Sequence, residues 1–219
     1  PLSGVDVLIG AGHGITINAD ADQGENFEVG NRFLAVSTLA SIQQDGRYEL
    51  AFRTKGKVGR DLLADATRRA IQTKKRLFGF FGCHEKHLPF QTSNGDFKPA
   101  LNVAVTDIVP LQPIAEKYTP EDISENPTLA DMTLSALEVL SHRSENFWLM
   151  IEAGDVDWAN HRNNIDNSVG AVLSGDAAFK TITDWVENNG GWDDTAVILT
   201  ADHGHYLTIT KPEALIPKE

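Results

Sequence analysis

The sequence predicts an α/β fold, in which a mostly parallel sheet has helices on both faces as an α/β/α sandwich. The first observation is that four apolar segments have the length and the β-branched or aromatic content of strands. Three of them are almost continuously apolar, as strands buried on both faces are. The segments are Val5–Ile9, Leu77–Phe81, Phe147–Ile151 and Ala196–Thr200. The second observation is that amphipathic helical patterns lie between them, and this alternation is typical of layered α/β proteins.

Three helices are predicted from apolar residues that recur at spacings of three and four. The first is Asp61–Lys74, in which leucines, alanines and an isoleucine share one face. The second, Thr128–Leu140, begins with a Thr-Leu-Ala-Asp sequence that resembles a capping box. The third, Val169–Val186, is followed by an Asn-Asn-Gly-Gly sequence that predicts its end.

No repeat or clear boundary divides the chain, so we interpret residues 1–219 as a single partial domain. Residues 82–127 contain six of the nine prolines and little periodicity, which indicates an insertion or long excursion within that domain. The chain begins at Pro1, with no initiator methionine and no apolar signal segment. We therefore expect either that processing removed the front or that the chain is a piece of a larger protein.

The negative charge of the chain is concentrated in its second half. The net charge is −12; residues 1–110 carry 13 basic and 12 acidic residues, whereas residues 111–219 carry 6 basic and 19 acidic ones. This acidity argues against nucleic acid or an anionic membrane as a partner, because phosphate groups bind basic surfaces. No apolar run reaches the length of a membrane-spanning helix. Two interpretations stay open: a solvated acidic face, or carboxylates collected to hold cations.

The predicted strand Phe147–Ile151 runs into Glu152, at the edge where open α/β sheets bind ligands. Asp157 and His161 follow at a spacing of four residues, so one helical turn places both on the same face. A carboxylate oxygen and an imidazole nitrogen so placed supply half of a zinc shell. The alternative is an exposed Asp–His pair that contributes roughly a few tenths of a kcal/mol.

Asp202 and His203 follow the predicted strand Ala196–Thr200 in the same way. Asp202 can instead cap a helix, although no helical pattern follows it. Two strand ends that each supply an aspartate and a histidine predict two metal half-sites side by side. Two cations about 3.5–4 Å apart suit in-line displacement at phosphorus. The mixed donors indicate zinc, with a harder ion such as magnesium nearby.

The segment Glu152-Ala-Gly-Asp-Val-Asp157-Trp-Ala-Asn-His161, followed later by Thr200-Ala-Asp202-His203, resembles the metal-binding core of the alkaline phosphatases. The resemblance implies an alkaline-phosphatase-like sandwich that is incomplete in this chain. It also implies that Glu152 is a magnesium ligand and that Asp157 and His161 hold one zinc ion. Asp202 and His203 would hold the second zinc ion.

Further expectations follow from the same resemblance. Trp158 lies where the family varies a residue close to the phosphate site. The implied activity is hydrolysis of small phosphate monoesters through a phosphoserine intermediate. A homodimer is expected because the family commonly forms one, and the expected location is the periplasm or the extracellular space.

The sequence also departs from the family. The nucleophilic serine and the phosphate-binding arginine have no match, so both are expected outside this chain; Asp166-Asn-Ser168 is superficially similar but fits a helix N-cap. The last zinc-binding histidine has no match either, since His205 lies only two residues after His203. We therefore expect an internal piece of an alkaline-phosphatase-like protein with little activity in isolation. The alternatives are a related phosphodiesterase, sulfatase or phosphomutase, and an inactive metal-binding or structural fragment.

Overall fold

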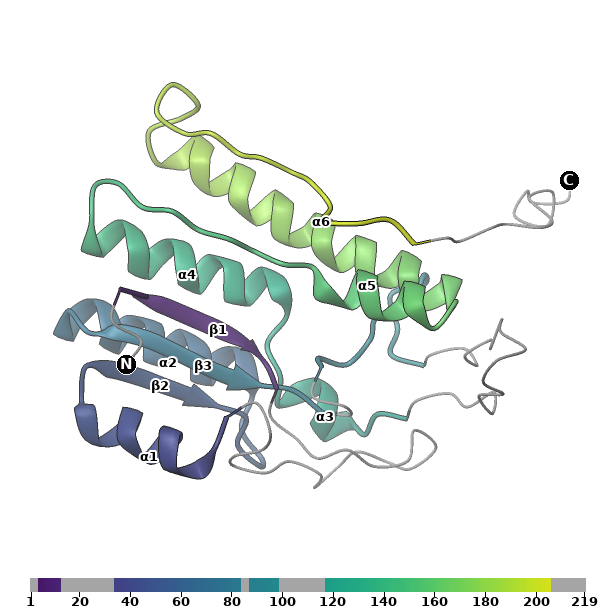
Figure 1. Ribbon diagram of the computed structural model, residues 1–219, viewed down its shortest axis with the longest axis horizontal. Coiled ribbons are helices and arrows are strands. Elements are labelled where there is room, and N and C mark those ends of the chain that lie inside the picture. Colours follow the sequence, from purple (N-terminus) through teal and green to yellow (C-terminus); the bar gives the residue numbers. More distant parts are fainter. Residues whose placement is uncertain (1–3, 13–33, 84–86, 99–116, 206–219) are drawn as a thin grey trace, which may run out of the picture.

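The computed structural model describes residues 4–12, 34–83, 87–98 and 117–205. Three strands form a parallel sheet in the order β1-β3-β2, with β3 in the middle. They are β1 (Val7–Ala11), β2 (Tyr48–Phe52) and β3 (Arg76–Phe81). Helices α2 (Gly59–Thr73) and α4 (Leu129–Arg143) cover one face of this sheet, and α1 (Val36–Asp45) covers the other (Figure 1). The predicted fold class, a parallel sheet with helices on both faces, is confirmed.

Two apolar cores lie on opposite faces of the sheet because successive side chains of a strand point in opposite directions. Leu77 and Phe81 of β3 are fully buried against α2 and α4. Phe78 and Phe80 of the same strand are buried on the α1 side. Full burial of a leucine or phenylalanine side chain contributes about 1.5–3 kcal/mol. The continuous apolar sequence of β3 is therefore explained by two packed faces.

The predicted strands Val5–Ile9 and Leu77–Phe81 correspond to β1 and β3, with small shifts at their ends. The predicted helix Asp61–Lys74 corresponds to α2, and Thr128–Leu140 corresponds to α4. Neither α1 nor β2 was expected from the sequence. Strand β2 is only five residues long, and its sequence Tyr-Glu-Leu-Ala-Phe has no regular alternation of apolar and polar residues, so its strand signal is weak.

The capping box of α4 is formed as the sequence predicts. Asp131 N donates a hydrogen bond to Thr128 Oγ1 at 3.1 Å, and Thr128 N donates one to Asp131 Oδ2 at 2.9 Å. A second capping box, between Thr119 and Asp122, begins the short helix α3 (Pro120–Ser124). These reciprocal bonds satisfy backbone donors that a helix start otherwise leaves without partners.

Two further helices follow along the chain, α5 (Gly154–His161) and α6 (Ile165–Asn188), and α6 packs against α4 and α5 (Figure 1). Helix α6 begins earlier than the predicted Val169, and its N-cap is Asn164, whose side chain accepts a hydrogen bond from Asn167 N at 3.1 Å. The interpretation of Asp166-Asn-Ser168 as the cap was therefore wrong by two residues, because an asparagine just before it makes the bond. In the part of the chain that the structure describes, no helix is both long and apolar enough to cross a membrane.

Two of the predicted strands are not strands in the structure. The segments Phe147–Ile151 and Ala196–Thr200 are neither helix nor strand, and they run alongside α4 and α6 (Figure 1). Among the described residues neither segment has a neighbouring strand, so their backbone groups form no ladder. Their outward side chains are exposed; Trp148 and Leu199, for example, are each 82% exposed. Apolar sequence predicted burial on two faces, whereas the structure covers Phe147–Ile151 on one face only and leaves Ala196–Thr200 mostly exposed.

Candidate metal centre

Helix α5 carries the first pair of predicted ligands. Asp157 and His161 lie one turn apart, and His161 Nε2 is 3.4 Å from Asp157 Oδ1. The aspartate lies in the first turn and the histidine in the last, the ends at which negative and positive charges respectively are favoured by the helix dipole. The structure thus places both side chains on one face, as their spacing predicted.

Two histidines from the segment after α6 reach the same carboxylate. His203 Nε2 is 3.3 Å and His205 Nε2 is 3.0 Å from Asp157 Oδ1. The ring centroids of His203 and His205 are 4.9 Å apart, and that of His205 is 4.6 Å from the His161 centroid. Asp157, His161, His203 and His205 each offer one ligand atom, and these atoms all lie within 4.8 Å of one another. We call these four residues the metal cluster.

The donor set of the metal cluster fits zinc, which is bound by imidazole nitrogen and carboxylate oxygen, most often four-coordinate. His203 Nδ1 lies 3.1 Å from the Gly204 carbonyl oxygen. When Nδ1 carries the proton and donates this bond, Nε2 presents its lone pair to the cluster, the arrangement that metal-binding histidines use. The hydrogen bond to Gly204 raises the pKa of His203, and the negative charges of Asp202 and Asp157 act in the same direction.

The other predicted ligands lie outside the metal cluster. The side chain of Asp202 is 92% exposed, and its Oδ2 is 3.9 Å from His203 Nε2. Glu152 is exposed just before α5 begins. Their roles as ligands of a second zinc ion and of magnesium stay predictions.

His205 is the residue that sequence reasoning missed. Its position two residues after His203 does not match that of the family's last zinc-binding histidine. The segment Asp202–His205 contains a different signal for His205. In an extended segment, side chains two residues apart point to the same side. His203 and His205 therefore face Asp157 together. The side chain of His205 is also the least exposed of the cluster, at 15%.

A closed circuit of four side chains, in which each contacts the next, lies beside the metal cluster. The Arg162 guanidinium carbon is 5.6 Å from the Trp158 ring centroid and 5.8 Å from that of Phe90. His87 completes the circuit, with its ring centroid 4.3 Å from Phe90 and 5.5 Å from Trp158. His87 and Phe90 are buried. Trp158 and Arg162 line a hollow of about 300 Å³ together with Asp157 and His161, so the circuit forms one wall of the space next to the cluster.

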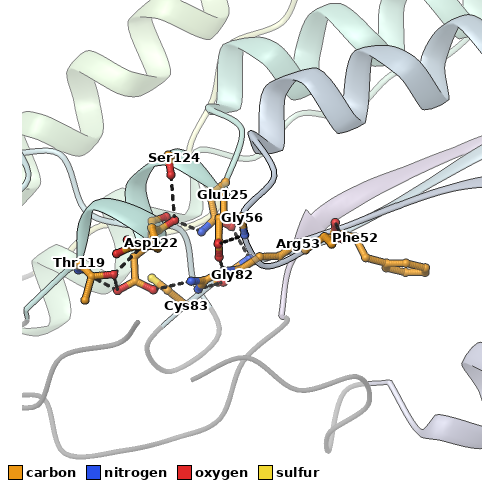
Figure 2. Close-up of polar contacts among 12 residues, drawn as sticks. Phe52, Arg53, Gly56, Gly82, Cys83, Thr119, Asp122, Ser124 and Glu125 are labelled. Carbon is orange, nitrogen blue, oxygen red and sulfur yellow. Dashed lines mark hydrogen bonds and ion pairs between the residues drawn. The ribbon is translucent and has the colours of Figure 1, made fainter. Parts of the chain in front are cut away.

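A buried ion-pair network holds the loop that carries His87 and Phe90 (Figure 2). Arg53, directly after β2, pairs with Asp122 Oδ1 at 2.8 Å and with Glu125 Oε2 at 3.0 Å, and all three side chains are almost completely buried. Arg53 also donates a hydrogen bond to the carbonyl oxygen of Gly82, directly after β3, at 3.1 Å. The network thus fixes the carboxyl end of the sheet to α3 and sets where the next loop starts.

The loop itself is held at three further points. Cys83 N donates a hydrogen bond to the His87 carbonyl at 2.8 Å, and Phe90 N donates one to the Tyr118 hydroxyl at 3.1 Å. A Cβ atom on Gly170 of α6 would lie 1.9 Å from the Gln91 carbonyl oxygen. Only glycine permits this close approach of loop and helix.

One carboxyl group near the cluster has a perturbed pKa. Burial raises the pKa of Asp155, in the first turn of α5, to about 6, and the nearby His87 opposes this shift. Burial also raises the pKa of Tyr118 well above its ordinary value. Desolvation disfavours the charged form of each acid.

Comparison with known proteins agrees with the resemblance of the two motifs. A family model described as alkaline phosphatase matches residues 4–215. The membrane-bound alkaline phosphatase of Bombyx mori is 36% identical over 87 residues, which are 40% of this chain and 15% of that protein. The alkaline phosphatase of Escherichia coli strain K12 is 34% identical over 91 residues, which are 42% of this chain and 19% of that protein. Alkaline phosphatase H of Pseudomonas aeruginosa is 33% identical over 98 residues, 45% of this chain and 20% of that protein. The matched part of the chain spans at most a fifth of these relatives' lengths.

Proposed function

Because the chain belongs to the alkaline phosphatase family, we propose that it carries part of the metal centre of a phosphatase that hydrolyses small phosphate monoesters. The observation that carries this proposal is the metal cluster, in which one carboxylate and three imidazoles converge within 4.8 Å. Its members are partly exposed, so a phosphate group can reach them. Membership of the family supports phosphate ester hydrolysis as the reaction. The carboxylate and imidazole donors of the metal cluster support zinc as a bound metal.

The proposal assigns zinc and magnesium to the site. Asp157 and His161 would hold one zinc ion, Asp202 and His203 the second, and Glu152 the magnesium ion. His205 would orient Asp157, because its Nε2 lies within hydrogen-bond distance of Oδ1. Bound metal ions of this kind polarise the phosphoryl group and activate a nucleophile. They also overcome the repulsion between a phosphate dianion and the site's carboxylates.

The proposal assigns no nucleophile to this chain, since no residue matches the serine or the phosphate-binding arginine that the family uses. Hydrolysis would then need those groups from elsewhere in the protein. By the same family membership we propose a homodimer and a periplasmic or extracellular location. A related phosphodiesterase, sulfatase or phosphomutase would share the metal ligands and differ in the nucleophile.

Zinc binding by the full 219-residue chain tests the proposal. In equilibrium dialysis, D157A/H203A should bind zinc at least about tenfold more weakly than the unchanged chain, since it loses two of four ligands. The matched control is D184A, which removes an exposed α6 aspartate that pairs with Lys180 at the surface. Equal and weak zinc binding by the unchanged chain and D157A/H203A would rule out the metal centre. Hydrolysis of phenyl phosphate with zinc and magnesium present measures how much of the reaction the chain performs alone.

A further inference from the structure

Helix α5 and its C-cap residue Arg162 present two parallel pairs of side chains to the same hollow. Asp157 and His161 form one pair, and Trp158 and Arg162, each one residue further on, form the other. Residues four apart lie above one another on a helix, so the second pair runs beside the first. A phosphate group bound at the metal cluster therefore has the Trp158–Arg162 pair beside the rest of its ester.

Two aromatic rings of the circuit contact the Arg162 guanidinium. Trp158 and Phe90 contact the guanidinium at 5.6 and 5.8 Å, distances typical of cation–π pairs. Rings stack on the flat faces of a guanidinium, whereas its N–H groups lie in its plane and point outward. An arginine held between two rings is ordered before a ligand arrives, so less entropy is lost when its N–H groups bind.

The rings that hold Arg162 are themselves fixed. His87 is 4% exposed and contacts both Phe90 and Trp158, so it closes the circuit behind the guanidinium. Phe90 is fully buried, and its backbone is bonded to the Tyr118 hydroxyl. His87 and Phe90 thus belong to the packed interior, and they hold the half-buried Trp158 and Arg162 in place.

The charge of Arg162 is distinctive in its surroundings. Among the described residues that line the hollow, it is the one permanent cation, beside one carboxylate, one imidazole and one indole. A planar guanidinium edge fits a carboxylate or a second phosphate, with two parallel hydrogen bonds. The indole of Trp158 supplies an apolar surface for the part of the ester between the two anionic groups.

We propose that Arg162 is a specificity-determining residue, which selects phosphate esters whose alcohol part carries a second negative charge such as a carboxylate. The inference rests on the proposed function and extends it from the phosphate group to the leaving group. Arg162 would contact that second anion directly, while the transferred phosphate stays at the metal cluster.

Binding of two non-hydrolysable probes to the zinc- and magnesium-loaded chain tests the proposal, whether or not the chain turns substrate over. Phenylphosphonate and 3-carboxyphenylphosphonate differ only in the carboxylate. By calorimetry, the carboxylated probe should bind about tenfold or more tightly to the unchanged chain, as expected for a charge-assisted pair. In R162A this preference should disappear while the affinity for phenylphosphonate changes by less than about threefold.

Two more variants separate recognition from folding. R162K keeps the charge but lacks the planar fork, so it should retain only part of the preference. R68A removes an exposed arginine on α2 and should leave the preference unchanged. Equal binding of the two probes to the unchanged chain, or a preference that persists in R162A, would overturn the inference alone. Failure of the loaded chain to bind either phosphonate would overturn the proposed function and this inference together.

Discussion

His205 Nε2 lies 3.0 Å from Asp157 Oδ1, although 48 positions separate the two residues in the chain. The contact ties the segment after α6 to helix α5 and brings a third imidazole to one carboxylate. Ligand carboxylates are commonly oriented by hydrogen bonds from neighbouring groups, and losing such a partner weakens metal binding. The pair therefore connects the two motifs that the sequence presents separately.

Replacing His205 should weaken zinc binding. In H205A the Asp157 carboxylate loses its shortest contact in the metal cluster, and the zinc affinity of the chain should fall about 10–100-fold. Competition with a chromogenic chelator measures this affinity. H142A is the matched control, because His142 is an exposed histidine at the end of α4. Zinc affinity that is the same in H205A and H142A would show that His205 has no part in the site.

Arg53 is expected to be among the most important residues for stability. R53M leaves Asp122 and Glu125 buried without the cation that both now contact. Breaking a buried ion pair in this way costs about 3–5 kcal/mol of unfolding free energy. Urea denaturation measures the loss. R68M, at an exposed ion pair, should change stability by no more than about 0.5 kcal/mol. Equally small losses of unfolding free energy in R53M and R68M would mean that the Arg53 network contributes little to stability.

Asp155 should make the metal-free chain less stable as the pH rises. Its pKa is about 6 in the folded chain, against 3.8 as the ordinary value, so the folded state holds the proton more tightly than the unfolded state. The contribution of Asp155 to stability is then greatest below about pH 4 and falls as the pH rises through 6. D155N removes the charge and should be more stable than the unchanged chain at pH 7, by on the order of 1–3 kcal/mol.

The gap between D155N and the unchanged chain should close as the pH is lowered from 7 to 4. Urea denaturation in the presence of a chelator, at several pH values, follows this gap. D65N, at an exposed aspartate of α2, should show no such trend. A gap that stays constant with pH would contradict the assignment to the Asp155 carboxyl group.

Much of the fold and part of the site could be predicted from the sequence. The pattern of α4 and its Thr128–Asp131 box depend on local bonds, which local sequence specifies. The Asp157–His161 pair follows from helix geometry in the same way. The Arg53 network and the contact between His87 and Trp158 could not be predicted, because they join residues far apart in the chain.

In the apolar segments, the sequence predicted strands that the structure does not contain. Phe147–Ile151 has strand-like sequence, and periodicity alone cannot say whether a neighbouring strand is present. In the structure Phe147 contacts Trp185 of α6 edge-on, with ring centroids 5.8 Å apart, while Trp148 and Met150 point outward. Burial on one face was inferred correctly, and burial on the other was not.

A substitution at Met150 tests whether Phe147–Ile151 is buried on one face or on both. Its side chain is 81% exposed, so M150K should change the unfolding free energy of the 219-residue chain by no more than about 0.5 kcal/mol. Leu137 of α4 is only 4% exposed, and L137K, which buries an unpaired charge, should cost several kcal/mol or prevent folding, because the ammonium loses its hydration. Thermal and urea denaturation of both variants measure these changes in unfolding free energy. A loss of about 2 kcal/mol or more in M150K would mean that the segment is a buried strand, as its sequence alone predicted.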